Sequence, residues 1–133
     1  MPGIIIDTTL LIAAERGKFD LQAFFRAHSH ARFSVSAVTI AELWHGVERI
    51  DPAFRASKEA KVRALLERIT ILDLTEEIAL LYAKIWANLA REGKLIGTHD
   101  MMIAATCLHH GHAVATLNAK HFGMVRGLQL ISV

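Results

Sequence analysis

Three acidic residues of this chain hold positions from which they can share one site. Asp7 directly follows the apolar run 3–6, and Glu42 comes six residues after the predicted strand 32–36. Asp100 opens a later helix. In an open α/β sheet, ligands bind in the crevice beyond the carboxyl ends of the strands. Clustered carboxylates there suit a hard divalent cation, Mg²⁺ or Mn²⁺, because these ions prefer oxygen ligands and keep several waters.

Each of these carboxylates also has a purely structural interpretation. Asp7 is a good N-cap for a helix that begins at Thr8. Glu42 has the spacing of a capping box with Thr39, and it also fits the solvent-facing side of its helix. Asp100 lies in a first helical turn, where the helix dipole favours negative charge. We favour a metal partner for Asp100, because the residues after it are apolar on almost every side and a buried charge needs a partner.

The other reactive side chains point less clearly to chemistry. His109, His110 and His112 gather near a helix end, but adjacent histidines diverge on a helix and the dipole favours a histidine there. Cys107 is expected to be a core thiol, and Asp73 is interpreted as a turn or cap residue. Since the sequence contains neither GxGxxG nor a Walker A motif, nucleotide binding through those loops is not supported.

Apolar runs and helical spacing predict alternating strands and helices. In the helix that begins at Thr75, we expect one apolar stripe to face the core, formed by Ile78, Leu81, Tyr82, Ile85, Trp86 and Leu89. The predicted strands are 3–6, 32–36, 70–72, 113–116 and 128–133, and the predicted helices are 8–16, 20–27, 37–49, 52–69, 75–92 and 99–110. This order predicts one α/β domain over 1–133, with a short, mainly parallel central sheet flanked by helices in three layers.

The composition is that of a globular domain with a sizeable core, since 53% of the 133 residues are hydrophobic and 21% are charged. A single cysteine excludes a disulfide framework and cysteine-rich zinc modules, and it makes the cytoplasm the expected location. Charges interrupt every apolar stretch before the roughly 18 residues of a membrane helix, so we expect neither a membrane span nor a signal peptide. The net charge of +2 permits RNA as a partner without arguing for it.

Four segments, spread over nearly the whole chain, carry a family resemblance. They are Ile-Ile-Ile-Asp7-Thr8-Thr9, Ile40-Ala-Glu42-Leu-Trp-His-Gly46, Gly97-Thr-His-Asp100-Met-Met-Ile-Ala-Ala105 and Ala-Thr116-Leu-Asn118-Ala-Lys-His-Phe122. In this order and at this spacing, the sequence resembles the PIN-domain ribonucleases of the VapC type.

The resemblance implies a PIN-like fold and a metal-dependent endoribonuclease that acts as the toxin of a toxin–antitoxin pair. It implies an RNA substrate, bound Mg²⁺ or Mn²⁺, a small VapB-like antitoxin and a homodimer. Carried over by position, Asp7, Glu42 and Asp100 would form the catalytic acidic triad that binds the metal.

The same resemblance implies roles for residues around the triad. Thr8 and Thr116 would support the metal shell through their hydroxyl groups. Asn118 stands where many members of the family have a fourth acid, so we expect one tightly held ion rather than two. The cationic candidates nearest in sequence for steering the RNA backbone are Arg49, Lys120, His121 and Arg126.

Two other classes of function remain open from the sequence. A carboxylate–metal site on an α/β sheet also occurs in phosphatases and receiver domains, although Asp7-Thr8-Thr9 lacks the Asp-x-Asp pattern of the former. A receiver domain would also have an acidic pair before the strand that leads to the aspartate, and no acidic residue precedes Asp7 here. A non-catalytic binding module would use the same carboxylates only as helix caps.

Overall fold

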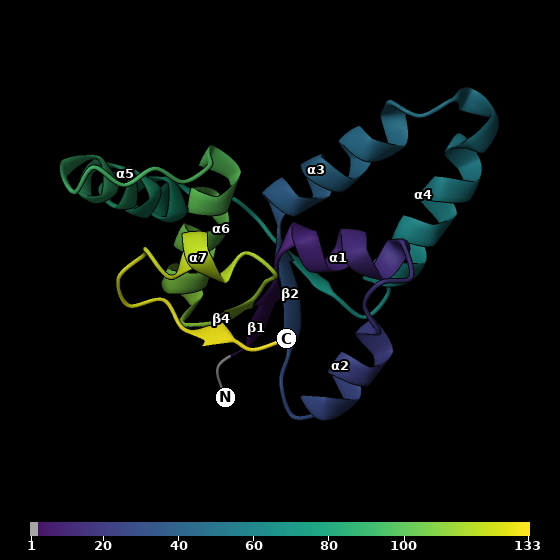
Figure 1. The fold of residues 1–133 in the computed structure, drawn as a ribbon, viewed down its shortest axis with the longest axis horizontal. Helices are drawn as coiled ribbons and strands as arrows, with labels where there is room; N and C mark the ends of the chain where they lie inside the picture. The colour runs from purple at the N-terminus through teal and green to yellow at the C-terminus, as the bar shows by residue number, and fades with distance from the viewer. Residues whose placement is uncertain (1–2) are drawn as a thin grey trace.

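The computed structural model describes residues 3–133 and has a five-stranded sheet at its centre. All neighbouring strands are parallel, in the order β3-β2-β1-β4-β5. Helices cover both faces of this sheet (Figure 1). The predicted three-layer α/β/α fold is therefore confirmed.

The strands are short, and β1 lies at the centre between β2 and β4. Their bounds are Ile4–Ile6 for β1, Phe33–Ser36 for β2, Thr70–Leu72 for β3, Ala113–Ala115 for β4 and Leu130–Ile131 for β5. The prediction for the last strand, 128–133, was too long. In the described sheet β5 lies at the edge beside the three-residue strand β4, and the register pairs only Leu130 and Ile131 with it.

The run of three isoleucines in β1 is explained by two separate hydrophobic clusters, one on each face of the sheet. Successive strand side chains point to opposite faces. Ile5 packs into the cluster that includes residues of α5 and α6, whereas Ile4 and Ile6 pack into the cluster with α1 to α4. A strand covered on both faces needs apolar residues at every position.

Seven helices surround the sheet, and none within residues 3–133 is long and apolar enough to cross a membrane. Their bounds are Thr8–Glu15 for α1, Leu21–Ala27 for α2, Ala37–Glu48 for α3, Pro52–Leu66 for α4, Glu76–Arg91 for α5, Thr98–His110 for α6 and Ala119–Phe122 for α7. The short helix α7 was not predicted, and α4 ends three residues before Ile69, the predicted end.

Helix α3 begins and helix α6 ends at the capping residue that the sequence predicts. The hydroxyl group of Ser36 accepts a hydrogen bond from the backbone N–H of Val38 and caps α3, which carries Glu42. Gly111 ends α6 with φ +67°, in the left-handed region that favours glycine. These two boundaries fix where Glu42 and Asp100 lie relative to the sheet.

The predicted apolar stripe of α5 is wrong at Trp86. Ile78, Ile85 and Leu89 are buried against the core, but the Trp86 side chain is 57% exposed and contacts the ring of Tyr82 from outside. Most contacts of α5 are with a single helix, α6. One helix covers a narrower face of α5 than the predicted stripe occupies. Trp86 follows Ile85 by about 100° around the helix and falls outside that face.

Candidate active site

Asp7 lies at the end of the central strand, where the parallel sheet brings it next to β4. Ile6 is in register with Ala115, and the Asp7 backbone N–H donates a 2.9 Å hydrogen bond to the Ala115 carbonyl. This pairing places Asp7 beside Thr116, the first residue after β4. The side chain of Asp7 is buried, with only 1% of the residue exposed.

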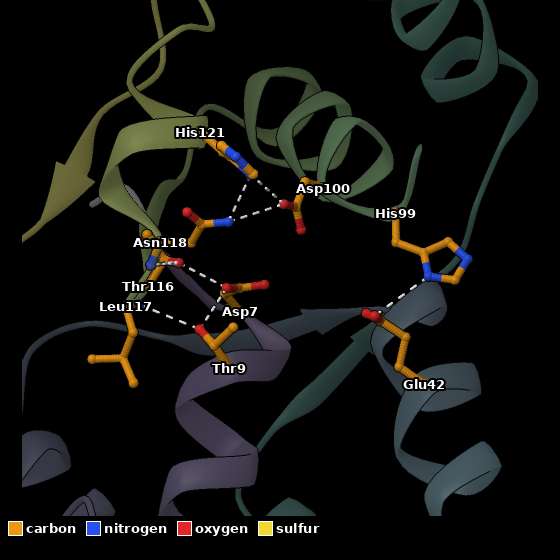
Figure 2. Close-up of polar contacts among 9 residues, drawn as sticks. All are labelled: Asp7, Thr9, Glu42, His99, Asp100, Thr116, Leu117, Asn118 and His121. Carbon is orange, nitrogen blue, oxygen red and sulfur yellow. Dashed lines mark hydrogen bonds and ion pairs between the residues drawn. The ribbon is translucent and has the colours of Figure 1, made fainter. Parts of the chain in front are cut away.

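The Asp7 carboxylate is held by two threonine hydroxyl groups. Thr9 Oγ1 and Thr116 Oγ1 each donate a 2.7 Å hydrogen bond to Asp7 Oδ2 (Figure 2). Asp7 occupies the N-cap position of α1, but its side chain makes no capping hydrogen bond. The N-cap interpretation therefore does not explain why a carboxylate is buried here.

The electrostatic surroundings of Asp7 disfavour its negative charge. Burial raises the pKa of Asp7, and the nearby Asp100 carboxylate raises it further, while hydrogen bonds from Thr116 and Thr9 oppose the rise. No Lys, Arg or His in residues 3–133 forms an ion pair with Asp7. A buried carboxylate beside a second carboxylate, without a cationic side chain, is a place where a metal cation would be stabilised.

Asp100 extends toward this region from the first turn of α6, and its side chain is 23% exposed. Asn118 Nδ2 donates a 3.2 Å hydrogen bond to Asp100 Oδ2, and His121 Nδ1 lies 3.5 Å from the same oxygen. Asn118 and His121 also contact each other, with 2.9 Å between Nδ2 and Nδ1. The structure thus places Asn118 in the crevice as predicted, and the unpredicted helix α7 places His121 against Asp100.

Glu42 extends from α3 into the crevice, and both of its carboxylate oxygens have a polar partner. Thr8 Oγ1 donates a 2.6 Å hydrogen bond to Oε1, and His99 Nδ1 lies 3.3 Å from Oε2. The capping-box interpretation is wrong, because Ser36 caps α3 and Thr39 Oγ1 lies 3.0 Å from Thr8 Oγ1 instead. The Thr8 hydroxyl group, expected in the metal shell, supports Glu42.

The three carboxylates come from three different elements and border one space (Figure 2). Asp7 and Asp100 face each other beside Asn118, and Glu42 stands across from them next to His99. In the described part of the chain, no three His, Cys, Asp or Glu side chains converge closely enough to bind one ion directly. The donor set fits a hydrated divalent ion that Asp7 and Asp100 could hold, with Glu42 reaching it through water.

The four cationic candidates are distributed unevenly around this space. His121 contacts Asp100, and Lys120 is exposed beside it on α7. Arg49 lines a cleft that Glu42 also lines. Arg126 instead donates a 2.6 Å hydrogen bond to Glu92 at the end of α5. No contact brings Arg126 to the carboxylates, because α7 turns the chain back toward α5 before residue 126.

Sequence reasoning missed three residues that support the carboxylates, namely Thr9, Thr39 and His99. Thr9 holds Asp7, Thr39 contacts Thr8, and His99 pairs with Glu42. Thr9 and His99 lie within two residues of a candidate acid, and this proximity in the sequence could have indicated a role at the site. Nothing in the local sequence connects Thr39 with Thr8, since that contact arises only when α1 and α3 pack together.

The histidine group and Cys107 take no part in this arrangement. His112 Nδ1 accepts a 3.0 Å hydrogen bond from the backbone N–H of Gly3, which precedes β1, so it lies at the opposite edge of the sheet. The rings of His110 and His112 stack with centroids 5.6 Å apart. Cys107 is fully buried, and burial raises the pKa of its thiol, as expected for a core residue.

Comparison with known proteins agrees with the resemblance read from the four segments. The family model described as the PIN domain matches residues 4–126. The chain is 37% identical to Ribonuclease VapC1 of Rickettsia felis over 135 aligned residues, covering 98% of this chain and 96% of the relative. This chain is a PIN-domain protein of the VapC family. It is 30% identical to the tRNA(fMet)-specific endonuclease VapC of Shigella flexneri, covering 94% and 93% of the two chains.

A solved structure of this VapC family has the same fold. The DNA-bound VapBC from Salmonella typhimurium superposes with a TM-score of 0.88 at 27% identity, over 98% of each chain.

The burial of Asp7 in this PIN domain gives a stability prediction. In metal-free buffer at neutral pH, we expect Asp7→Asn to raise the free energy of unfolding. The pKa of Asp7 is higher in the folded protein than in the unfolded chain. The wild type therefore loses stability as the pH rises from about 3.9, the pKa of a free aspartate, through the pKa of Asp7 in the folded protein. An asparagine keeps an oxygen for Thr9 and Thr116 and carries no charge, so the difference should vanish below about pH 3.9.

Urea unfolding in the presence of a chelator, repeated across pH, measures this difference. Asp73→Asn is the matched control, because Asp73 is exposed and its substitution should leave the curve unchanged. A metal-free Asp7→Asn protein that is less stable than the wild type at neutral pH would show that the fold stabilises the charged carboxylate.

Proposed function

We propose that this protein is a divalent-metal-dependent endoribonuclease that hydrolyses RNA phosphodiester bonds, as the toxin component of a toxin–antitoxin pair. The observation that carries this proposal is the buried Asp7 carboxylate, which faces Asp100 and forms no ion pair with a cationic side chain among residues 3–133. The ribonuclease and endonuclease names of VapC relatives at 30–37% identity support the choice of RNA as substrate.

The metal would be Mg²⁺ or Mn²⁺, held by Asp7 and Asp100 together with Glu42. When bound, such an ion offsets negative charge that develops on the phosphate oxygens and lowers the pKa of a coordinated water. An all-oxygen set of carboxylates suits these hard cations better than the softer transition metals.

The side chains of this chain supply orientation and proton transfer. Thr9 and Thr116 fix one oxygen of Asp7, so its carboxylate is oriented before substrate arrives. Asn118 orients Asp100 in the same way. Glu42 stands on the other side of the space, where it can accept the proton of the attacking water, and Thr8 holds its Oε1 in place for that role.

The two alternative functions have less support in this geometry. A binding module that uses its carboxylates as caps does not fit, because neither Asp7 nor Glu42 caps its helix. A phosphatase-like enzyme shares the carboxylates, and a small phosphate ester assayed beside RNA and DNA separates it from a nuclease.

We also propose two protein partners. VapBC complexes among the structural matches support a small VapB-like antitoxin. A homodimer is supported by large apolar side chains on the outside of α5, where Leu80 is 62% exposed and Trp86 is 57% exposed. Such side chains gain free energy when a second surface covers them.

The triad gives the most direct activity prediction. Asp7→Asn, Asp100→Asn and Glu42→Gln should each abolish metal-dependent RNA cleavage and growth inhibition while the protein remains folded, because each removes one charge in nearly isosteric form. Cleavage of RNA with added Mg²⁺ or Mn²⁺, with circular dichroism as the folding check, measures this loss. Asp73→Asn, an exposed acid that also follows a strand, should keep full activity. Full activity of either Asp7→Asn or Asp100→Asn would refute the carboxylate site.

Asn118 gives a prediction about metal affinity. Asn118→Asp places a carboxylate within hydrogen-bonding distance of Asp100, so we expect Mn²⁺ to bind at least severalfold more tightly or a second ion to bind. Calorimetric titration of the full chain measures affinity and stoichiometry. Asn88→Asp, on the exposed side of α5, is the matched control. Unchanged affinity and stoichiometry in Asn118→Asp would mean that residue 118 does not tune the metal site.

The proposed homodimer is tested by light scattering of the chain without its antitoxin. We expect the mass of two chains, because large apolar side chains of α5 that are exposed to water are costly in a monomer. A monodisperse monomer at micromolar concentration that still cleaves RNA would refute the dimer and leave the nuclease proposal intact.

A further inference from the structure

A cleft of about 460 Å³ lies between α1, α3 and α4 and includes Glu42 in its wall. Helices α3 and α4 are joined at their outer end, and α1 packs against both of them (Figure 1). The apolar part of the lining is formed by Ile12, Leu43 and Val62. One end of this α3–α4 cleft therefore meets the carboxylates, and the rest leads outward along α3.

The α3–α4 cleft is lined by three arginine or lysine side chains and two glutamates. Its cationic or protonatable residues are Arg16, His45, Arg49, Lys58 and His99, and its acids are Glu15 and Glu42. Glu15 is paired with Lys58 at 3.1 Å. Arg16 and Arg49 are exposed and form no ion pair within residues 3–133. Positive charge is thus available for an anionic ligand beyond Glu42.

One face of α3 forms an open path along this cleft. Glu42, Gly46 and Arg49 lie within about 60° of one another around the helix, and Arg49 lies about 10 Å beyond Glu42 along its axis. Between them, Gly46 leaves space, since a Cβ there would meet one neighbouring side-chain atom, the Cε of Lys58, at 3.7 Å. The lack of a side chain at Gly46 leaves room for a chain that passes from Glu42 toward Arg49.

We propose that the α3–α4 cleft binds a single-stranded segment of the RNA substrate on one side of the bond that is cut, an inference that rests on the proposed ribonuclease function. Arg49 and Arg16 bind its phosphates. Unstacked bases lie on the apolar lining and on the imidazole rings of His45 and His99, since histidine is one of the side chains on which RNA bases stack.

A protein segment is the other class of occupant that an apolar lining would suit. The two unpaired arginines and the contiguity of the cleft with the carboxylates favour a polyanion that must reach the active site. RNA phosphates meet both requirements. Binding of the antitoxin in the cleft is distinguished from RNA binding by the variants Gly46→Glu and Gly46→Gln.

The decisive comparison is Gly46→Glu against Gly46→Gln. The two side chains have nearly the same volume and both favour a helix more than glycine does, so they differ mainly in charge at the cleft. Binding of a fluorescein-labelled single-stranded oligoribonucleotide of mixed sequence to the full chain is followed by anisotropy in a chelator, which prevents metal-dependent cleavage. We expect Gly46→Glu to bind about tenfold more weakly than Gly46→Gln at low salt, with the difference shrinking as salt rises.

A second pair tests the phosphate contact itself. Arg49→Gln should lower the slope of log affinity against log salt by about 0.7, the value for one contact to a single strand. Arg26→Gln, another exposed arginine at the C-terminal end of a helix, should leave the slope unchanged. Equal RNA binding by both Gly46 variants, together with an unchanged slope in Arg49→Gln, would overturn the proposal.

Loss of a co-expressed antitoxin from the Gly46 variants with unchanged RNA binding would assign the cleft to the protein partner and overturn the proposal as well. Cleavage of total cellular RNA by the wild type with Mn²⁺ is measured in parallel. An absence of cleavage would contradict the proposed function. Cleavage by the wild type, together with equal RNA binding by Gly46→Glu and Gly46→Gln, would contradict only the proposal that the cleft binds RNA.

Discussion

The burial of one negative charge at the end of the central strand is the constraint on which the rest of the site depends. Asp7 has almost no contact with solvent, burial raises its pKa, and the carboxylate of Asp100 raises that pKa further. Two threonine hydroxyl groups offset part of the cost, but they bring no charge. A fold that keeps such a residue loses stability without a cation, which is typical of a site shaped for binding rather than for packing.

The parallel sheet brings the site together from distant parts of the chain. Because β1 pairs with both β2 and β4, the segments that follow these strands emerge at one edge, carrying Asp7, the start of α3 and Thr116. Helix α6 then directs Asp100 toward this edge from its first turn, while α7 places Asn118 and His121 against Asp100. The same packing of α1 on α3 that joins Thr8 to Glu42 also forms one end of the α3–α4 cleft.

The fold class and the places of Asp7, Glu42 and Asp100 in the fold could be predicted, because the boundaries of the elements that carry them depend on local signals. Apolar runs, Ser36 before α3 and Gly111 after α6 all act within a few residues. The contacts of the site depend on tertiary packing. Neighbouring residues in the sequence do not indicate that the Thr8 hydroxyl group bonds to Glu42, or that Arg126 pairs with Glu92. Helix α7 has only four residues, too few for an apolar period to be recognised.

The central claim is that Asp7 and Asp100 hold a divalent cation that the buried charge requires. Anomalous diffraction from a crystal of the full chain grown with Mn²⁺ tests it most directly, because the scattering locates the ion without reference to activity. The account predicts an anomalous peak between the Asp7 and Asp100 carboxylates, on the side that faces Glu42, and no such peak in crystals of Asp7→Asn. A peak at the histidines 109, 110 and 112 with none between the carboxylates, or an equal peak in Asp7→Asn, would contradict it.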